Sequence, residues 1–506
     1  MQEFVDTINS YVWSSALVYL CLGAGLFFSV MTRFVQVRQF REMIRLLSKG
    51  KESEKGISTF QALAVSLSGR VGTGNIAGVA AAIGFGGPGA VFWMWMVAFL
   101  GASTAYVEST LGQIYKEVDE GQYRGGPAFY IEKALGQKWY AWLFALATVL
   151  ATGFLLPGVQ ANAIGNAVDL AMGGGTLIES PFGEVSQVKL ITGSVVVLFL
   201  GIIIFGGVKR IAHFTMFVVP IMALLYVASA VVIIFMNIEA VPGVVKLIFE
   251  DAFTPMAGFG AAIGWGVKRG IYSNEAGQGT GPHAAAAAEV QHPAQQGLVQ
   301  AFSVYVDTLF VCTATAFMIL ITGAYHVTGV DTLASGGALA ATVDPNSPAF
   351  TQMAVENVIA GFGGPFVAIA LFFFAFTTLL AYYYIAETNV AYIKRTFNIP
   401  GLKLILKFGL MGAVFYGAIK TAGLAWAMGD IGVGLMAWLN IVGILIIFLV
   451  GKPAIKALKD YEAQQAAGVE EYSFDPKTLG IKNADFWVER FEARGKQTGN
   501  KVIGSK

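Results

Sequence analysis

About eleven long apolar segments dominate the chain. Each reaches the roughly 20 residues that a helix needs to cross the hydrocarbon core of a bilayer, and only 13% of the residues are charged, against about 25% in soluble domains. The segments are residues 13–35, 58–83, 90–115, 139–172, 188–205, 211–236, 256–289, 295–322, 365–392, 402–419 and 431–450. We therefore predict an all-α, multi-pass membrane protein that lies in a lipid bilayer.

Lysine and arginine are unevenly distributed among the connections between these segments. The connection after the first segment, VRQFREMIRLLSKGKESEKG, is densely basic, whereas residues 322–364 contain no Lys or Arg. Since positive charge beside a span is retained in the cytoplasm, we predict that the N-terminus is outside and the C-terminus is cytoplasmic. The acidic residues Glu3 and Asp6 fit a retained first span rather than a cleaved signal peptide, which begins with basic residues.

Composition and motifs exclude several functional classes. The formal net charge of +1 argues against nucleic-acid binding, which requires a basic excess. Cys21 and Cys312 lie in apolar runs, where packing is the expected role. Neither a phosphate-binding loop nor a metal-ligand spacing of histidines is present, and no nucleophile stands beside a base. We therefore expect no enzyme, no metal-ligating histidine, no ATP-driven pump and no obligatory protein partner.

The second apolar segment contains residues that a membrane helix does not need. Within SLSGRVGTGNIAGVAAAIGFGGPG, three glycines, Gly69, Gly72 and Gly74, fall within six residues at mid-span, and each weakens a helix by roughly 1 kcal/mol relative to alanine. Non-helical backbone at membrane depth is tolerated where it is buried in protein or lines a cavity. There, free N–H groups attract a carboxylate and free carbonyls attract Na⁺. The alternative is that these glycines only let two helices pack closely.

A second segment is interrupted in the same way. The stretch FGAAIGWGVKRGIYSNEAGQGTGPHAAAAAE combines many glycines with Ser273, Asn274, Glu275 and Gln278. Counted from the second apolar segment, the interrupted ones are the first and the sixth of ten. Paired interruptions at corresponding positions of two halves indicate a five-plus-five inverted-repeat transporter whose site lies near the middle of the membrane.

Three stretches carry a resemblance to a known family. SGRVGTGNIAGVAAAIGFGGPGAVFWMW, YRGGPAFYIEKALG and RGIYSNEAGQGTGPHAAA resemble signatures of the alanine or glycine:cation symporter family, and the likeness covers nearly the whole membrane region. The resemblance implies a bacterial inner (plasma) membrane symporter for a small neutral amino acid, alanine and/or glycine. It further implies Na⁺ as the coupling ion, no organic cofactor and the broken-helix fold of the neurotransmitter:sodium symporters with one extra N-terminal helix.

This fold divides the chain into four parts. Residues 1–35 form the periplasmic N-terminus with the extra helix, and residues 36–57 form a basic cytoplasmic linker. Residues 58–450 form the ten-helix transporter core with its inverted repeats. Residues 451–506 form a polar cytoplasmic tail, which we expect to fray at its end.

A more distant likeness places the coupling ion. RVGTGN resembles the unwound AVGLGN segment of a bacterial amino-acid transporter among the neurotransmitter:sodium symporters. The likeness implies that Na⁺ binds the carbonyls of Ser68 and Val71 together with the adjacent hydroxyls of Thr377 and Thr378. These oxygen ligands suit a hard cation. The alternative is that each threonine bonds the carbonyl one turn earlier in its own helix.

The same likeness places the substrate carboxylate at the first interruption. It implies that the N–H groups of Thr73 and Gly74 bind the carboxylate, and we include the flanking residues Gly72 and Asn75 in the substrate site. Asn75 also matches a ligand of a second sodium ion in the distant relative, but Arg70 stands where that site has a small residue. We hypothesise that Arg70 leaves one Na⁺ per substrate.

The alternative for Arg70 is an ion pair with Glu108, Glu275 or Asp307, because an isolated charge inside a membrane is costly.

Other polar residues are predicted to bind the amine or line the pocket. We predict that oxygens of the second interruption bind the amine, and that an apolar wall contacts a short side chain. The amine would be bound at Ile271, Tyr272, Ser273 and Asn274, and the wall would consist of Trp265 and Gly266. Gln160 is predicted to bind the zwitterion, with a helix–helix hydrogen bond as its alternative, and Glu275 is predicted to be structural. Proton-coupled symport is the main alternative function, and a channel is a weaker one.

Overall fold

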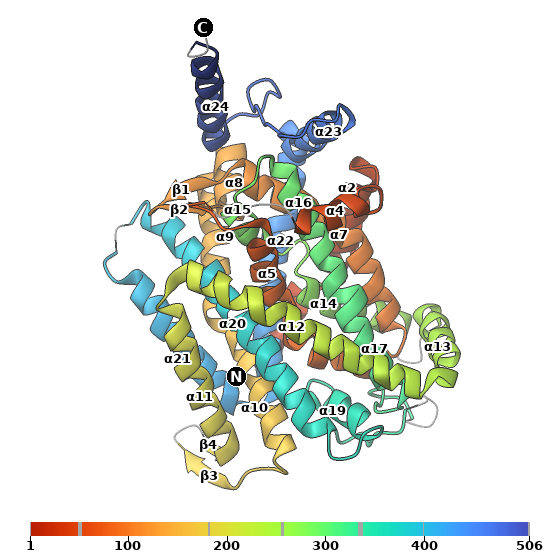
Figure 1. The fold of residues 1–506 in the computed structure, drawn as a ribbon. Helices are drawn as coiled ribbons and strands as arrows, with labels where there is room; N and C mark the ends of the chain where they lie inside the picture. Colours follow the sequence, from red (N-terminus) through yellow and green to blue (C-terminus); the bar gives the residue numbers. More distant parts are fainter. Residues whose placement is uncertain are drawn as a thin grey trace.

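The computed structural model describes residues 2–48, 53–180, 183–254, 258–331, 337–397 and 399–503, and helices make up most of them (Figure 1). Two antiparallel hairpins are the only sheets in these ranges. One pairs β1 (Glu117–Asp119) with β2 (Gln122–Arg124), and the other pairs β3 (Leu177–Ser180) with β4 (Gly183–Ser186). The all-α prediction is confirmed.

Eight helical segments are long and apolar enough to cross a membrane, or nine if α1 (Gln2–Val12) and α2 (Ser15–Met31), bent by 40°, form one span. Six of them are single helices: α7 (Ala90–Ile114), α11 (Gln187–Ile204), α12 (Gly207–Met236), α20 (Gly363–Lys394), α21 (Leu402–Ile419) and α22 (Ala422–Gly451). Two contain a π-helical turn: α9 (Lys138–Leu150), η2 (Ala151–Leu155) and α10 (Leu156–Ala171); and α16 (Pro293–Tyr305), η4 (Val306–Cys312) and α17 (Thr313–Ile321).

The two remaining predicted spans are the interrupted ones. The first consists of α5 (Thr59–Arg70), η1 (Gly74–Gly78) and α6 (Val79–Gly86), and the second of α14 (Phe259–Asn274) and α15 (Gly281–Ala287). Residues 256 and 257, where the second was predicted to begin, lie outside the described ranges. Each of the predicted apolar segments thus has a helical counterpart in the described part of the chain.

Short elements cover the two ends of the bundle. One end carries α3 (Val35–Arg38), α4 (Phe40–Leu47), the β1–β2 hairpin, α8 (Pro127–Leu135), α23 (Pro453–Ala466) and α24 (Asp485–Ile503) (Figure 1). We call it the tail end. The other, which we call the opposite end, carries the β3–β4 hairpin, η3 (Ile238–Ala240), α13 (Val241–Phe253) and α19 (Ala349–Glu356).

Helix α16 begins at the tail end with an uncommon cap. The buried His292 ring accepts a hydrogen bond from Ala294 N at Nδ1 (3.1 Å), while its Nε2 lies 3.1 Å from Asp460 Oδ2 on α23. Burial lowers the pKa of His292 below its usual value, although Asp460 acts in the opposite direction. A ring that accepts at Nδ1 must be neutral there, so Nε2 carries the proton that faces Asp460.

We expect this cap to weaken in acid. Because the pKa of His292 is lower in the folded protein, the unfolded chain binds more protons as the pH falls from about 7.5 to about 5.5, and stability decreases. His292→Asn retains a capping oxygen. Over this pH range, its free energy of unfolding should decrease by about 1 kcal/mol less than that of the parent, as measured by thermal unfolding in detergent. An equal loss in both proteins would contradict this account.

Candidate functional site

The first interruption lies in the buried centre of the bundle. Helix α5 starts at a capping box in which Ser58 and Gln61 bond each other's backbone N–H groups, and it ends at Arg70. The backbone leaves the helix at Val71 and Gly72 and resumes as the π-helical turn η1. All residues from Gly69 to Gly78 are buried. The predicted interruption at these glycines is therefore present, and it is enclosed by protein.

The second interruption follows α14 and depends on left-handed backbone. Glu275, Gly277 and Gly279 have φ values of 58°, 86° and 82°, a conformation that glycine adopts without strain. The N–H groups of both glycines donate to the carboxylate of Glu108, at 3.2 and 3.1 Å, and Asn440 donates to the same carboxylate at 2.6 Å. The freed N–H groups of this second interruption thus already bind a carboxylate of the protein.

Three of the four predicted sodium ligands meet beside the first interruption. The Thr378 hydroxyl of α20 lies 2.8 Å from the Ser68 carbonyl and 3.5 Å from the Val71 carbonyl. It also bonds its own i−4 carbonyl, Phe374 O, at 2.9 Å, so both readings of this threonine coexist in one geometry. Oxygen atoms from two separate spans therefore converge here without a fixed charge.

The fourth predicted sodium ligand faces elsewhere. The Thr377 hydroxyl donates to Phe374 O at 3.0 Å and lies 4.0 Å from the Met222 sulfur of α12. Successive residues of a helix point about 100° apart, so Thr377 faces α12 while Thr378 faces α5. The structure brings together Ser68, Val71 and Thr378, and it does not bring Thr377 to them.

Gln160 of α10 faces the first interruption. Its Oε1 accepts the N–H of Thr73 at 3.0 Å, and the N–H of Gly72 donates to Asn75 Oδ1 at 2.8 Å. The hydroxyl of Thr73 is fully buried and has no hydrogen-bond partner within the described ranges. Buried hydroxyls are almost always paired in folded proteins. The interruption thus contains an unpaired hydroxyl and two backbone N–H groups that donate to side chains. These polar groups make it suitable for a polar ligand.

Gly74 in the first interruption touches the last turn of α14. Residues 271–274 were predicted to lie in the second interruption, but they are helical, and that interruption spans residues 275–280. A Cβ atom placed on Gly74 would lie 3.1 Å from Ser273 Cα and 3.2 Å from Tyr272 Cδ1, both on α14. These separations are tighter than ordinary contacts, so glycine lets the two broken spans approach each other. Four of the predicted substrate residues, Thr73, Gly74, Tyr272 and Ser273, therefore lie around one buried point.

Asp307 on η4 is a central residue that the sequence analysis considered only as a partner of Arg70. Its Oδ1 accepts hydrogen bonds from Asn75 Nδ2 (2.6 Å) and Ser273 Oγ (3.0 Å), and its Oδ2 accepts one from Thr308 Oγ1 (2.8 Å). Asn274 Nδ2 reaches the same threonine at 3.3 Å. One buried carboxylate thus bonds to side chains of both interrupted spans. The available signal was an aspartate within an apolar segment, which is by default a functional candidate.

Arg70 forms no ion pair with Glu108, Glu275 or Asp307 among the described residues. Its Nη1 donates to the carbonyl of Gln300 at 3.1 Å and to the hydroxyl of Ser303, while Nε and Nη2 have no partner among the described residues. No ion pair of Arg70 is found in the described part of the chain. The alternative of a direct pair with Glu108, Glu275 or Asp307 is thus not observed, and the guanidinium remains a buried positive charge beside the first interruption.

Three residues predicted to bind the amine or line the pocket have structural contacts. The Ile271 carbonyl accepts a hydrogen bond from Gln278 Nε2 at 2.6 Å. Trp265 stacks on Phe85 with ring centroids 4.6 Å apart, and Gly266 packs so closely on α7 that a Cβ would lie 2.5 Å from Ala90 O. Trp265 and Gly266 therefore contact α6 and α7, and their role as a pocket wall stays a prediction.

A buried charge cluster closes the interruptions from the opposite end. Arg269, 1% exposed, pairs with Asp430 at 2.7 Å and lies over the Trp426 ring at 4.2 Å. Lys268 also lies 2.7 Å from Asp430, and the rings of Trp426 and Tyr272 are 4.8 Å apart. This cluster was not predicted because the last span was expected to begin at residue 431, whereas α22 begins at Ala422. Asp430 is thus inside the span and is neutralised by its two cationic partners.

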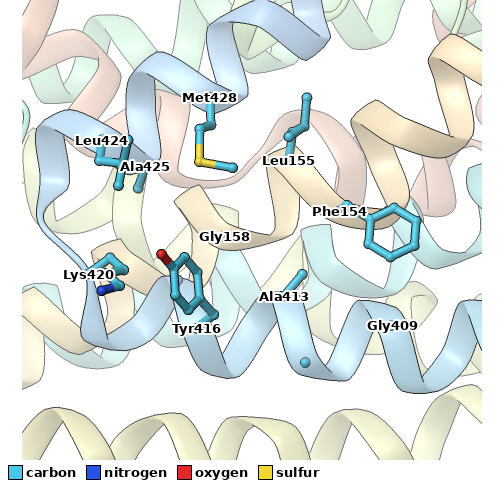
Figure 2. A pocket seen from close by; sticks show the side chains of 12 residues that line it. Phe154, Leu155, Gly158, Gly409, Ala413, Tyr416, Lys420, Leu424, Ala425 and Met428 are labelled. Carbon is cyan, nitrogen blue, oxygen red and sulfur yellow. The ribbon is translucent and has the colours of Figure 1, made fainter. Parts of the chain in front are cut away.

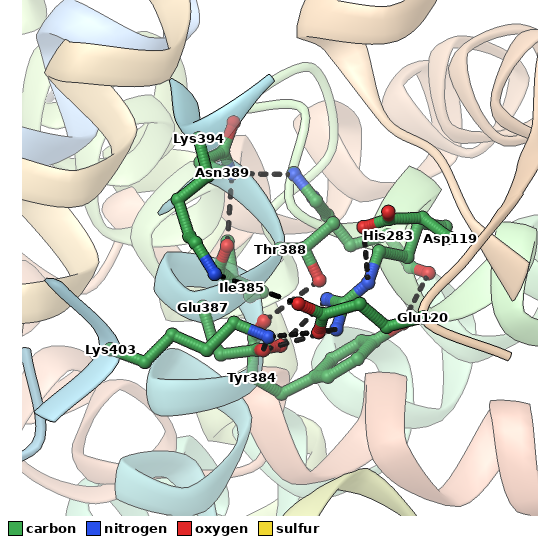
Figure 3. Close-up of polar contacts among 11 residues, drawn as sticks. Asp119, Glu120, His283, Tyr384, Ile385, Glu387, Thr388, Asn389, Lys394 and Lys403 are labelled. Carbon is green, nitrogen blue, oxygen red and sulfur yellow. Dashed lines mark hydrogen bonds and ion pairs between the residues drawn. The ribbon is translucent and has the colours of Figure 1, made fainter. Parts of the chain in front are cut away.

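A second charge cluster lies at the tail end (Figure 3). Glu387 on α20 accepts hydrogen bonds from Arg124 of β2 at 2.7 and 3.0 Å and forms an ion pair with Lys403 of α21 at 2.9 Å. Glu120 of the same hairpin pairs with Lys403 and lies 3.6 Å from Lys394. The hydrogen bond from Lys403 lowers the pKa of Glu120. The cluster fixes the β1–β2 hairpin to two spans.

A cavity of about 320 Å³ lies away from both interruptions (Figure 2). It is lined by η2, α10, α21 and the start of α22, with Tyr416, Lys420 and Met428 among its side chains. None of the residues predicted to bind substrate or sodium lines it. The candidate site is therefore the closed region between the two interruptions, and not this cavity.

Comparison with known proteins identifies the family of the chain. Residues 1–476 match the Sodium:alanine symporter family. The chain is 57% identical over 497 residues to YrbD of Bacillus subtilis, covering 97% of this chain and 98% of the relative. It is 50% identical over 454 residues to the "Sodium/proton-dependent alanine carrier protein" of Bacillus sp. PS3, covering 89% and 98%.

A solved structure supports the fold. The crystal structure of MhsT in complex with L-phenylalanine superposes with a TM-score of 0.52 at 16% identity, covering 79% of this chain and all of that one. At this identity the likeness concerns the arrangement of helices alone. With two interrupted spans in one polytopic all-α fold and a match over nearly its full length, the chain belongs to the sodium:alanine symporter family.

Proposed function

We propose that the chain is a secondary active transporter that imports a small neutral amino acid, alanine and/or glycine, together with Na⁺. The observation that carries the proposal is the convergence of the Thr378 hydroxyl on the carbonyls of Ser68 and Val71 at the first interruption. Family membership and the PS3 relative, which is named an alanine carrier, support it.

The geometry suggests how ion and substrate are coupled. Na⁺ bound by Ser68 O, Val71 O and Thr378 Oγ1 would hold the backbone on one side of Gly72. The N–H groups of Thr73 and Gly74, on the other side, would then be positioned for a carboxylate, which would replace Gln160 Oε1 as the acceptor of the Thr73 N–H. Each ligand thus stabilises the backbone that the other needs, so each raises the affinity for the other by the same factor.

One charge cluster and the packing of α5 with α15 would supply the two closures that alternating access requires. The basic linker and tail mark the tail end as cytoplasmic by the positive-inside rule, which makes the opposite end periplasmic. The cluster of Arg269, Asp430 and Trp426 would close the outer side, and α5 with α15 would close the inner side. A channel, the weaker alternative, would need both sides to open at once.

Proton coupling is a second candidate, and Asp307 is the observation that favours it. This buried carboxylate bonds to Asn75 on the first interrupted span and to Ser273 on the second. Protonation would remove its acceptor capacity at one oxygen, which would loosen the connection between the two spans. We rank it second because oxygen ligands for Na⁺ already converge at Thr378.

Uptake of labelled alanine and glycine into proteoliposomes, with Na⁺, Li⁺ and H⁺ gradients imposed separately, tests the proposal. We expect accumulation with a Na⁺ gradient alone. Because the buried Arg70 charge disfavours a second cation nearby, we expect one Na⁺ and one net charge per alanine. A ratio of two would contradict the role of Arg70, and accumulation driven only by H⁺ would favour the Asp307 alternative.

A further inference from the structure

A buried lysine at the tail end is enclosed by aromatic rings from distant parts of the chain. Lys116, just after α7, is 0% exposed. Its Nζ lies 4.2 Å from the ring centroid of Tyr123, 4.6 Å from that of Phe486 and 5.5 Å from that of Trp487. The faces of aromatic rings attract a cation. Two of these rings belong to the C-terminal segment, so Lys116 is enclosed only while that segment is docked.

The same ammonium group contacts the junction of the two interrupted spans. Lys116 donates to the carbonyl of Ala288 at 2.9 Å. The N–H of Ile57 donates to Ala287 O at 3.0 Å, and the N–H of Glu289 donates to Ile57 O at 2.8 Å. Ile57 directly precedes the cap of α5, and Ala288 directly follows α15. A short parallel bridge therefore joins the tail ends of both spans.

The C-terminal segment covers this bridge. Trp487 is 1% exposed, and its Nε1 donates to the carbonyl of Gln113 at 2.7 Å. The side chain of Gln113 in turn donates to Ala288 O at 3.0 Å. Arg490 forms an ion pair with Glu289 at 2.5 Å, and Tyr123 donates to the same carboxylate at 2.8 Å. The Ala288–Glu289 side of the bridge is thus bonded to Arg490 directly and to Trp487 through Gln113.

We propose that residues 472–490 are an intramolecular latch on the inner gate of the transporter. While the latch is docked, Trp487 and Arg490 keep α5 and α15 joined at the tail end, and the site stays closed on that side. Substrate can leave only after the Ile57 bridge opens, which requires the latch to loosen. This inference rests on the proposed function, since a gate presupposes alternating access.

Trp487 and Arg490 act through the bridge, so they are positioning residues and do not contact substrate. Arg490 is partly exposed, with 24% of its side chain accessible, and can exchange its partner for water. Trp487 supplies the larger part of the docking energy through its buried area and one hydrogen bond. The latch thus combines one strong anchor with one weak ion pair, as expected for a local contact that opens without global unfolding.

Amide hydrogen exchange of the purified full-length protein tests the latch directly, because the amides of Ile57 and Glu289 report on the bridge itself. In Trp487→Ala we expect exchange over residues 57–60 and 285–289 to accelerate by about fivefold or more, since loss of one net hydrogen bond changes an opening equilibrium by about that factor. Arg490→Ala, a milder change, should accelerate the same peptides less. Trp487→Phe keeps an aromatic ring but loses the Nε1–H that donates to Gln113, so it should accelerate the same peptides less than Trp487→Ala.

A matched control is available in the same segment. Lys477→Ala removes the exposed pair with Glu492 and should leave the bridge peptides unchanged. Exchange that accelerates only within residues 472–503 in Trp487→Ala would overturn the latch. Alanine binding in saturating Na⁺ is measured on the same samples. If the parent protein does not bind alanine, the proposed function is contradicted. The latch is tested by the exchange pattern alone.

Discussion

Replacing Thr378 with valine is expected to abolish Na⁺-dependent alanine transport. Valine keeps the shape of threonine but removes the hydroxyl that lies between the carbonyls of Ser68 and Val71. Loss of an oxygen partner of a charged group costs roughly 1.5–3 kcal/mol, which lowers Na⁺ affinity by about 10- to 150-fold. Uptake by proteoliposomes at increasing Na⁺ concentration measures this change, with thermal unfolding as a check on the fold.

Thr377→Val is the matched control. Its hydroxyl bonds to Phe374 O of its own helix and faces the Met222 sulfur of α12, away from Ser68 and Val71, so its loss should leave the Na⁺ dependence within about threefold of the parent. The likeness to the neurotransmitter:sodium symporters alone assigns both hydroxyls to the ion. Equal losses in the two variants would support that assignment and contradict the distinction drawn from the structure.

Gly74→Val is expected to abolish alanine binding. The added side chain would meet Ser273 and Tyr272 at about 3 Å, and a β-branched residue further restricts the backbone. The clash would push the two interrupted spans apart at the point where the carboxylate is predicted to bind. Overpacking of this kind costs about 1–3 kcal/mol in stability, so purified variants are matched for monodispersity and melting temperature before titration with alanine in saturating Na⁺.

Gly78→Ala provides the comparison one turn later. A Cβ there would lie 3.5 Å from Trp426 and 3.9 Å from Arg269, which are ordinary contacts. We expect alanine affinity to change by less than about threefold, because a tolerated methyl group alters packing by under about 1 kcal/mol. Parent-like alanine binding by Gly74→Val would mean that the carboxylate is held elsewhere.

The features predicted correctly from the sequence have strong local causes. Glycines concentrated at mid-span predict an interruption because each weakens the helix, and the backbone leaves the helix at Val71 and Gly72. Long apolar runs predict spans because a bilayer leaves the backbone no other partners. The meeting of Ser68, Val71 and Thr378 came from the resemblance and not from composition, since they lie far apart in sequence.

The features that were missed depend on partners distant in sequence. Asp430 was predicted to lie in a loop because an aspartate disfavours a membrane span. It is stable inside α22 because it pairs with Arg269 and Lys268 on another helix. The facing of Thr377 and Thr378 depends on the rotation of α20 against α5 and α12, which hydropathy cannot fix in a helix that is apolar on all sides. Trp487 lies in a polar tail, so its burial against α7 had no local signal.

Alanine affinity measured as a function of Na⁺ concentration tests the central claim most directly. If ion and substrate share the first interruption, raising Na⁺ should raise alanine affinity in the parent, alanine should raise Na⁺ affinity by the same factor, and Thr378→Val should flatten both dependences. Calorimetric titration of the purified protein in NaCl and in choline chloride gives these values. Equal alanine affinity in the two salts would contradict a coupled site built on Ser68, Val71 and Thr378.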